Sequence, residues 1–331
     1  MNFIVNYRNF IPIKIGLERC GYIVHENLWR PTQAELDDCH GYLICMYDAI
    51  KRPDRILRLK RRLKAAGVPL IGWNRDGPWN KGEKPWRLAL LKSLNLLDIY
   101  ASHTLQAAEG FAPVVLYLPN AAWMDSYNLA GASLAAMRDH AWHEYDVSFI
   151  GNFNAERYPE FRPRADFLSE VYRRLSPLNL RFCFKNGAGM SPPEQVAVIQ
   201  KSRINLNFGA ACDDGMEKSW GLPERCFGVP ACGGFLLSEE RGHAKDSFIP
   251  GEEWVSFGDI DDCVAKIKYY LAHPDEARQI AERAYKRIIQ EHTYEHRAKT
   301  LIQAAYNWRN KKINQDSGDE RQLNFKVKQK I

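Results

Sequence analysis

Short apolar runs alternate with amphipathic stretches along most of this chain, and this alternation constrains the fold more than any other feature. In the first half, amphipathic segments at 55–66 and 84–97 predict helices. Buried strands are predicted around them, at 42–47, 70–73, 98–101 and 114–118. Strands that alternate with helices are typical of a layered α/β fold with a parallel sheet. The first half is therefore expected to form one doubly wound domain.

The second half repeats the pattern, with strands predicted at 146–150, 180–184, 204–208 and 234–237. We expect a domain boundary between residues 145 and 146, which gives an N-terminal domain at 1–145 and a C-terminal domain at 146–309. Residues 310–331 are polar and unpatterned, so they predict a flexible tail. Ligands of doubly wound domains bind at the carboxyl ends of the strands, where two such domains form a cleft.

Composition narrows the classes of function. A net charge of +6 suits anionic ligands but falls short of a nucleic-acid signature, so no nucleic acid is expected as a partner. None of the eight cysteines has CxxC spacing, which favours free thiols in a reducing compartment. The N-terminus lacks the long apolar core of a signal peptide, and no run approaches 18 apolar residues. We therefore expect a cytoplasmic protein.

The segment from 204 to 239 carries the densest chemical signal. It predicts a strand, a glycine-containing loop, a helix with Pro223 in its first turn, and a Gly-Gly pair before another strand. The N–H groups at such a helix end bind anions. Here a carboxylate from Glu224 would take ribose hydroxyls, and the guanidinium of Arg225 would clamp a phosphate. The alternative is that Glu224 only stabilises the helix and Arg225 forms a surface ion pair.

Several motifs occur in a fixed order between residues 146 and 305: DVSFIGNF at 146–153, SRINLNFG at 202–209, ERCFGVPACGGFLLSE at 224–239, a long segment at 248–276, and EHTYEHRAKTL at 291–301. This ordered set resembles the CgeB-like (spore-maturation-protein-like) branch of the group 1 glycosyltransferases. The likeness in residues 1–145 is looser and depends on strand order and on LPNAAW at 118–123.

The resemblance implies a GT-B fold, in which two Rossmann-like doubly wound domains face each other across a cleft. It implies that the N-terminal domain takes a saccharide, lipid-linked or protein acceptor and the C-terminal domain a nucleoside-diphosphate sugar, without a cofactor or an obligatory metal. Carried over by position, it implies donor-binding roles for Gly151, Asn152, Arg164, Asn207, Phe208, Gly209, Arg225 and Gly233. Glu224 joins these candidates for the separate reason given next.

One position departs from the family pattern. The family usually has a glutamate after the phenylalanine that corresponds to Phe227, and it is expected to hold the nucleotide ribose; this chain has Gly228 there. Glu224 lies one helical turn earlier on the same face, so it could supply the missing carboxylate. Alternatively, the chain holds its donor differently or weakly.

Two residues of the first half are candidates for the general base. Asp76 lies in a loop at 72–86 rich in tryptophan, turn formers and charge, which suits sugar binding, although a rigid surface loop is an equal alternative. His103 follows a predicted strand and is the second candidate, against a structural role for a histidine at such a place.

Two further features have a structural and a functional interpretation. Asp259 and Asp261 form a DxD sequence, a metal–diphosphate signature elsewhere, but they precede a predicted helix, so Asp259 is expected to cap it and no metal is expected. Residues 51–64 hold eight basic side chains, which favours a solvated outer helix. The alternative is peripheral contact with anionic lipid head groups at the inner face of the membrane, or with a phosphorylated acceptor.

The leading hypothesis from the sequence is a sugar-nucleotide-dependent glycosyltransferase. A sugar-nucleotide epimerase of the same fold and a non-catalytic module that binds sugar nucleotides or glycans are the alternatives, the last because of Gly228.

Overall fold

The computed structural model describes residues 1–7, 10–75, 85–209 and 220–328, with only the backbone described from 313 onward. The chain divides into two compact units. Unit 1 is built from the described parts of 1–74, 83–118 and 295–331, and unit 2 from those of 75–82 and 119–294.

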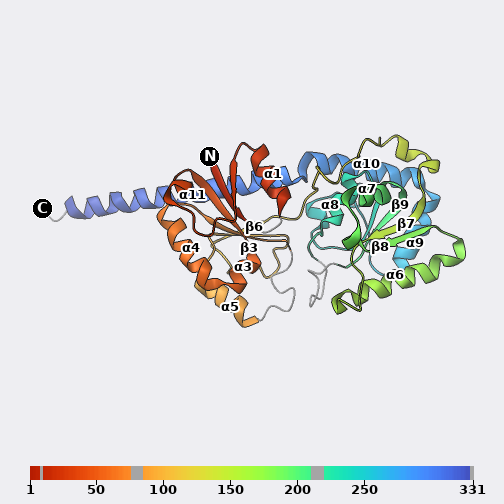
Figure 1. Ribbon diagram of the computed structural model, residues 1–331, viewed down its shortest axis with the longest axis horizontal. Coiled ribbons are helices and arrows are strands. Elements are labelled where there is room, and N and C mark those ends of the chain that lie inside the picture. Colours follow the sequence, from red (N-terminus) through yellow and green to blue (C-terminus); the bar gives the residue numbers. More distant parts are fainter. Residues whose placement is uncertain (8–9, 76–84, 210–219, 329–331) are drawn as a thin grey trace. The chain divides into compact units, whose positions relative to one another are not determined.

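In the described part of unit 1, six parallel strands form one sheet in the order β2-β1-β3-β4-β5-β6 (Figure 1). The strands are β1 (Asn2–Asn6), β2 (Ile23–Glu26), β3 (Cys39–Cys45), β4 (Leu70–Asn74), β5 (Ile99–Ser102) and β6 (Val114–Tyr117). The helices are α1 (Ile11–Arg19), α2 (Gln33–Asp37), α3 (Met46–Lys51), α4 (Pro53–Ala65), α5 (Pro85–Leu94) and α11 (Tyr294–Lys328).

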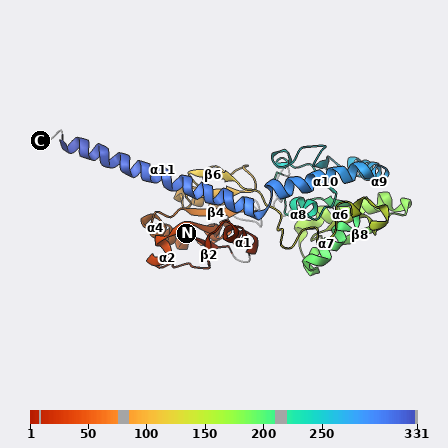
Figure 2. The ribbon, with the colours of Figure 1, turned by 90° about the horizontal axis from the view of Figure 1, so that it is seen from above.

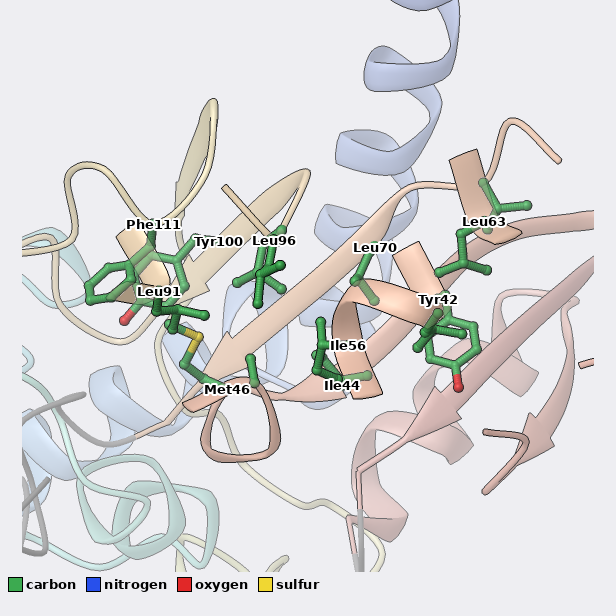
Figure 3. Packing of buried hydrophobic residues seen from close by; sticks show 14 of the residues in the cluster. Tyr42, Ile44, Met46, Ile56, Leu63, Leu70, Leu91, Leu96, Tyr100 and Phe111 are labelled. Atoms are coloured by element: carbon green, nitrogen blue, oxygen red, sulfur yellow. The ribbon is translucent and has the colours of Figure 1, made fainter. Parts of the chain in front are cut away.

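The main core of unit 1 lies between its sheet and α3, α4 and α5. Along α4, Ile56, Leu59 and Leu63 recur at helical spacing and are buried, and Pro53 begins the helix where its missing N–H costs nothing. Figure 3 shows Ile56 and Leu63 among side chains from the strands, such as Tyr42 and Leu70. Full burial of one such aliphatic side chain stabilises the fold by about 1.5–3 kcal/mol.

In the described part of unit 2, five parallel strands form a sheet in the order β11-β10-β9-β7-β8. The strands are β7 (Tyr145–Ile150), β8 (Phe182–Lys185), β9 (Ser202–Asn207), β10 (Leu236–Glu239) and β11 (Val255–Phe257), and the α-helices are α6 (Arg162–Leu175), α7 (Pro192–Gln200), α8 (Arg225–Ala231), α9 (Ile260–Ala272) and α10 (Pro274–Glu291). From β7 the chain runs to β8 on one side and then returns to β9 on the other. The strand order therefore reverses between β7 and β9, the place where ligands of such sheets bind.

Each face of the second sheet has its own core. On the face of α6 and α9, the rings of Phe167 and Phe208 stack with their centroids 3.8 Å apart, and Phe257 stacks on Phe167 at 5.5 Å. The other core contains Phe227 of α8 and Ile288 of α10. The predicted pair of Rossmann-like α/β units is therefore confirmed.

The units divide the chain elsewhere than at the expected boundary between 145 and 146. The segment from Pro119 to Glu144 belongs to unit 2, to which it is tied by side chains. Arg138 forms an ion pair with Glu282 of α10 at 2.7 Å, and the Gln200 amide donates to the carbonyl of Leu129 at 2.9 Å. A new strand was predicted to begin at residue 146, but the contacts change near residue 118.

The end of the chain also differs from its expectation. Residues 310–331 were expected to form a flexible tail, whereas the described backbone continues α11 as one helix to Lys328 (Figure 2). At the start of this stretch, α11 is attached to unit 1: Arg309 donates to the carbonyl of Cys39 at 3.1 Å, and Lys312 donates to that of Lys64 at 3.1 Å.

The predicted helix cap at the DxD sequence is confirmed. Asp259 is the N-cap of α9, and its carboxylate accepts from the backbone N–H of Asp262 at 2.8 Å. Asp261 pairs with Arg174 of α6. The two acidic side chains of the DxD sequence thus have structural partners.

We expect Asp259→Ala to lower the free energy of unfolding by about 0.5–2 kcal/mol, because it leaves a helix N–H without its acceptor. Asp259→Asn retains a side-chain oxygen that can accept the same hydrogen bond. It should lower the free energy of unfolding by only a few tenths of a kcal/mol. Urea unfolding of both variants measures the difference. Equal destabilisation by alanine and asparagine would contradict the capping role.

Candidate functional site: a pocket at the strand crossover of unit 2

A pocket of about 300 Å³ lies in unit 2 at the carboxyl ends of β7 and β9, a size that suits a small-molecule ligand. Its lining comes from five parts of the unit: the end of β7 with the turn that follows, β9, the first turns of α8, the turn and helix after β8, and the segment that precedes β7. The lining residues used below are Trp123, Tyr127, Gly151, Asn152, Gln195, Glu224, Arg225 and Gly228.

Arg225 joins the two strands at this point. Its Nε donates to the carbonyl of Ile150, at the end of β7, at 2.8 Å, and its Nη1 donates to Oδ1 of Asn207, at the end of β9, at 2.6 Å. The guanidinium also lies 4.5 Å from the ring centroid of Phe149. Arg225 is thereby fixed in orientation, with its charge at the edge of the pocket.

Gly151 makes this approach of Arg225 possible. A Cβ at this position would collide with Nη2 of Arg225 and would also meet the ring of Phe149 at 3.0 Å. Only glycine therefore lets the guanidinium lie against the turn that follows β7. The sequence motif predicted this turn as a binding position, and Gly151 and Asn152 do line the pocket.

Arg164 has a different role from the one its position implied. Its guanidinium donates to the carbonyls of Asn152, Phe208 at 2.9 Å and Gly209 at 2.6 Å. These carbonyls belong to the turns that follow β7 and β9, so Arg164 holds the two turns together. Its side chain is buried and is not part of the pocket lining.

The strand ends carry an excess of positive charge. Burial, reinforced by the nearby charge of Arg164 and opposed by Glu239, lowers the pKa of Arg225 to about 9, which leaves it protonated at neutral pH. Arg241 also contributes to this field, and it pairs with Glu239 at 2.5 Å. A buried guanidinium in such a field is stabilised by an anion, so the pocket electrostatics favour a phosphate-bearing ligand.

Glu224 lines the pocket from the N-cap position of α8. Its Oε1 accepts from Arg75 at 2.7 Å and from the hydroxyl of Tyr294 at 2.7 Å. Burial and the neighbouring Glu224 raise the pKa of Tyr294 well above its usual value, so this hydroxyl remains a donor. The carboxylate is 57% exposed, and Oε2 can still accept from a ligand.

The helix start itself differs from the expectation. Pro223 was placed in the first turn of a helix whose N–H groups would meet an anion, but α8 begins at Arg225. The N–H of Cys226 donates to the carbonyl of Pro223 at 2.9 Å, and the N–H of Phe227 donates to the backbone carbonyl of Glu224 at 3.0 Å. These first N–H groups are used within the turn, so the Arg225 side chain is the group that α8 offers to an anion.

The space that the family glutamate would fill is open in this chain. A Cβ at Gly228 would have only ordinary contacts, with the ring of Tyr127 at 3.9 Å. The hydroxyl of Tyr127 donates to Oε1 of Gln195 at 2.9 Å, and the Gln195 amide donates to the carbonyl of Met190 at 3.1 Å. Tyr127 is therefore held in place beside Gly228.

Trp123 is the polar group that the sequence analysis missed. Its ring lines the pocket, and its Nε1 is buried without a hydrogen-bond partner among the residues that the structure describes. A buried N–H without an acceptor costs about 1–3 kcal/mol, which a ligand acceptor would recover. Trp123 lies in LPNAAW, which was noted only as part of a loose resemblance.

The remaining predicted site residues lie around the pocket or elsewhere. Asn207 ends β9 and orients Arg225, and Phe208 follows the strand and packs in the core. Gly209 has φ +61° and its N–H donates to Glu239 at 2.7 Å, whereas Gly233 has φ +77° and follows the C-cap of α8. Both glycines serve backbone conformations that disfavour side chains.

Of the two candidate bases, one is described by the structure, and it does not line this pocket. Asp76 lies outside the described residues. His103 lies in unit 1 directly after β5, is 1% exposed, and its backbone N–H donates to the carbonyl of Asn74 at 3.1 Å.

Neither a metal-ligand cluster nor a membrane-spanning helix is present among the described residues. No group of three or more His, Cys, Asp or Glu side chains in these ranges could hold a metal ion. Within the same ranges, every helix is too short or too polar to cross a lipid bilayer.

The family model for "glycosyl transferase-like" proteins matches residues 122–303, which is more than half of the chain. The chain belongs to this glycosyl transferase-like family. The match begins just before Trp123 and covers all the pocket residues named above. No curated protein sequence matches the chain.

Solved glycosyltransferases share the fold of this glycosyl transferase-like protein. HepE from Anabaena, in complex with UDP and glucose, aligns with a TM-score of 0.58 at 10% identity, over 92% of this chain and 99% of that one. Sucrose-phosphate synthase from Thermosynechococcus elongatus aligns at 0.57 and 11%, over 92% and 98%. The UDP-forming trehalose-phosphate synthase from Burkholderia xenovorans aligns at 0.53 and 13%, over 81% and 73%. The GT-B fold expected from the sequence is thus confirmed.

Proposed function

We propose that this glycosyl transferase-like protein transfers a sugar from a nucleoside-diphosphate sugar to a saccharide, lipid-linked or protein acceptor. The donor binds in the pocket of unit 2, with its diphosphate against Arg225 and the turn at Gly151 and Asn152. The acceptor binds through unit 1. The observation that carries the proposal is the Arg225 guanidinium, oriented by β7 and β9 at the point where sheets of this type bind ligands.

Uridine is the first nucleotide to test, because HepE has been solved with UDP and with UDP-glucose. We further propose that the chain belongs to the CgeB-like branch of the family, on the ordered motifs between 146 and 305. A cytoplasmic location is part of the same proposal. It is supported by the free thiols of Cys20, Cys39, Cys183, Cys232 and Cys263, as expected in a reducing compartment.

Transfer is proposed to need no bound metal and no cofactor. Support comes from the DxD sequence, since Asp259 caps α9 and Asp261 pairs with Arg174. The positive field at Arg225 would instead offset the charge that develops on the leaving diphosphate. Asp76 and His103 are retained as candidates for the general base, and the burial of His103 makes Asp76 the first to test by substitution.

The decisive experiment follows release of labelled sugar from UDP-, GDP- and dTDP-sugars, in EDTA and with added Mg²⁺. We expect slow hydrolysis of one donor without acceptor, unchanged by EDTA. Binding without any release, even with candidate acceptors, would favour the non-catalytic binding module. Rearrangement of the sugar while it remains on the nucleotide would favour the epimerase, and a loss in EDTA restored by Mg²⁺ would contradict metal independence.

Trp123→Phe removes the indole N–H and keeps most of the ring. We expect UDP to bind about two- to tenfold more weakly, since one hydrogen bond to the ligand is lost. Trp254→Phe is the matched control, because Nε1 of Trp254 is also buried without a partner among the described residues but lies outside the pocket lining. Isothermal titration calorimetry measures both affinities. Equal affinities for the Trp123 variant and the parent would remove this contact from the site.

The carboxylate of Glu224 is proposed to accept from the ribose in place of the family glutamate. Because Glu224 is partly exposed, we expect Glu224→Gln to weaken UDP about three- to tenfold, at the lower end of the cost of a lost charged acceptor. Arg225→Lys keeps the charge but loses the fork, so it should weaken UDP more than uridine. Glu240→Gln, an exposed carboxylate outside the pocket, is the control. Unchanged binding by the Glu224 variant would assign the ribose to other groups.

A further inference from the structure

Unit 1 has a hollow of its own, between α4 and the segment that follows β2. Its volume is about 470 Å³, and we call it the arginine groove. It is lined by Trp29, Arg30, Arg52, Arg55, Arg58, Leu59 and Arg62.

The fold assembles the arginine groove from two segments that are distant in sequence. Arg55, Arg58 and Arg62 recur on one face of α4 at helical spacing. The guanidinium of Arg55 lies 3.9 Å from the ring centroid of Trp29, and that of Arg62 donates to the carbonyl of Pro31. These two contacts hold the segment at 29–31 against α4, which adds Arg30 to the arginines of the helix.

Negative charge in the arginine groove is scarce. Asp54 pairs with Arg58 at 2.9 Å and approaches Arg52 at 3.7 Å. Among the residues that the structure describes, Arg30, Arg55 and Arg62 have no carboxylate within ion-pair distance. Five guanidinium groups thus line one hollow, and among the described residues only Asp54 forms ion pairs with them. Asp48 interacts electrostatically with Arg55 from beyond ion-pair distance. The remaining repulsion among the guanidinium groups is relieved when an anion binds.

The residue type indicates which anion fits. Guanidinium groups bind phosphate oxygens in pairs through a planar fork, and all five cations that line the groove are arginine. A single contact would be weak, because the Arg58 side chain is 71% exposed. Several guanidinium groups around one hollow can instead share two phosphate groups.

We propose that the arginine groove binds a ligand through a pyrophosphate or a pair of neighbouring phosphate groups. The chemistry is the same for a soluble phosphorylated saccharide and for the head groups of an anionic phospholipid surface. That this phosphate belongs to the acceptor, or to the membrane that carries it, rests on the proposed function; the affinity for phosphate does not.

The test measures binding of inorganic pyrophosphate to the full chain by titration calorimetry in low salt, with UDP present to occupy the pocket of unit 2. The double variant Arg30→Gln/Arg58→Gln removes two cations of the groove while leaving the Trp29–Arg55 contact. Arg61→Gln is the matched control, since Arg61 is exposed on the same helix but does not line the groove. We expect the double variant to bind pyrophosphate at least about tenfold more weakly than the parent. The affinity of the control should be within about twofold of the parent's.

Vesicles distinguish the two sources of phosphate. The same proteins are sedimented with phosphatidylcholine vesicles, with and without phosphatidylglycerol. If the groove serves a membrane, the anionic vesicles retain the parent and Arg61→Gln but not the double variant; if it serves a soluble acceptor, pyrophosphate binds and the vesicles retain none. Equal losses in the double variant and in Arg61→Gln would show an effect of net charge alone and would overturn the proposal. So would a double variant that binds both probes like the parent.

The outcome is independent of the donor site. If UDP does not bind at all, the proposed function fails. The difference in pyrophosphate affinity between the double variant and Arg61→Gln can still be measured. If UDP binds to all three proteins while the groove variants do not differ in either assay, the groove proposal fails and the proposed function stands.

Discussion

The buried guanidinium of Arg225 is the interaction on which the candidate donor site depends. It joins the ends of β7 and β9, the neighbouring strands between which the strand order of unit 2 reverses. One hydrogen bond goes to the end of β7 and one to Asn207 of β9. Hydrogen bonds of charged groups contribute about 1.5–3 kcal/mol each, so two of them fix the side chain firmly. Gly151 leaves the room, and Arg164 ties the adjoining turns from behind. A charge held this rigidly at a pocket edge needs no reorganisation when an anion arrives.

Gly228 is the residue at which this chain departs from the pattern of the family it resembles, and other polar groups lie near it. Gly228 removes a carboxylate from the middle of α8 and leaves space beside Tyr127. Tyr127 is fixed by Gln195, and Glu224 is fixed by Arg75 and Tyr294. The polar groups available to a ribose are therefore distributed around the pocket instead of being concentrated in one glutamate. In the proposed donor site, the arginine for the phosphates is present as in the family pattern, whereas the groups that would hold the ribose differ from that pattern.

The two units concentrate positive charge in different ways. In unit 2 Arg164 and Arg241 are buried and Arg225 is partly buried, and all three donate to carbonyl, amide or carboxylate oxygens, which gives a site of fixed geometry. In unit 1 the arginines of the groove come from α4, from its N-cap and from the segment at 29–31, and their ion pairs among the described residues are with Asp54 alone. The first design suits one phosphate geometry. The second suits a ligand whose phosphates vary in position.

The sequence by itself determined the alternation of strands and helices, because periodicity is a local property, and it indicated Gly151, Asn152, Glu224 and Arg225 through one ordered set of motifs. It did not single out β1, β2 and β11, which the structure adds to the two sheets. Only the tertiary structure decided the rest. It carried Trp123 and Tyr127 across the expected domain boundary into the pocket, and Trp29 and Arg30 against α4. It also engaged Arg164 with backbone carbonyls outside the pocket lining, since side chains from distant segments meet only where packing brings their backbones together.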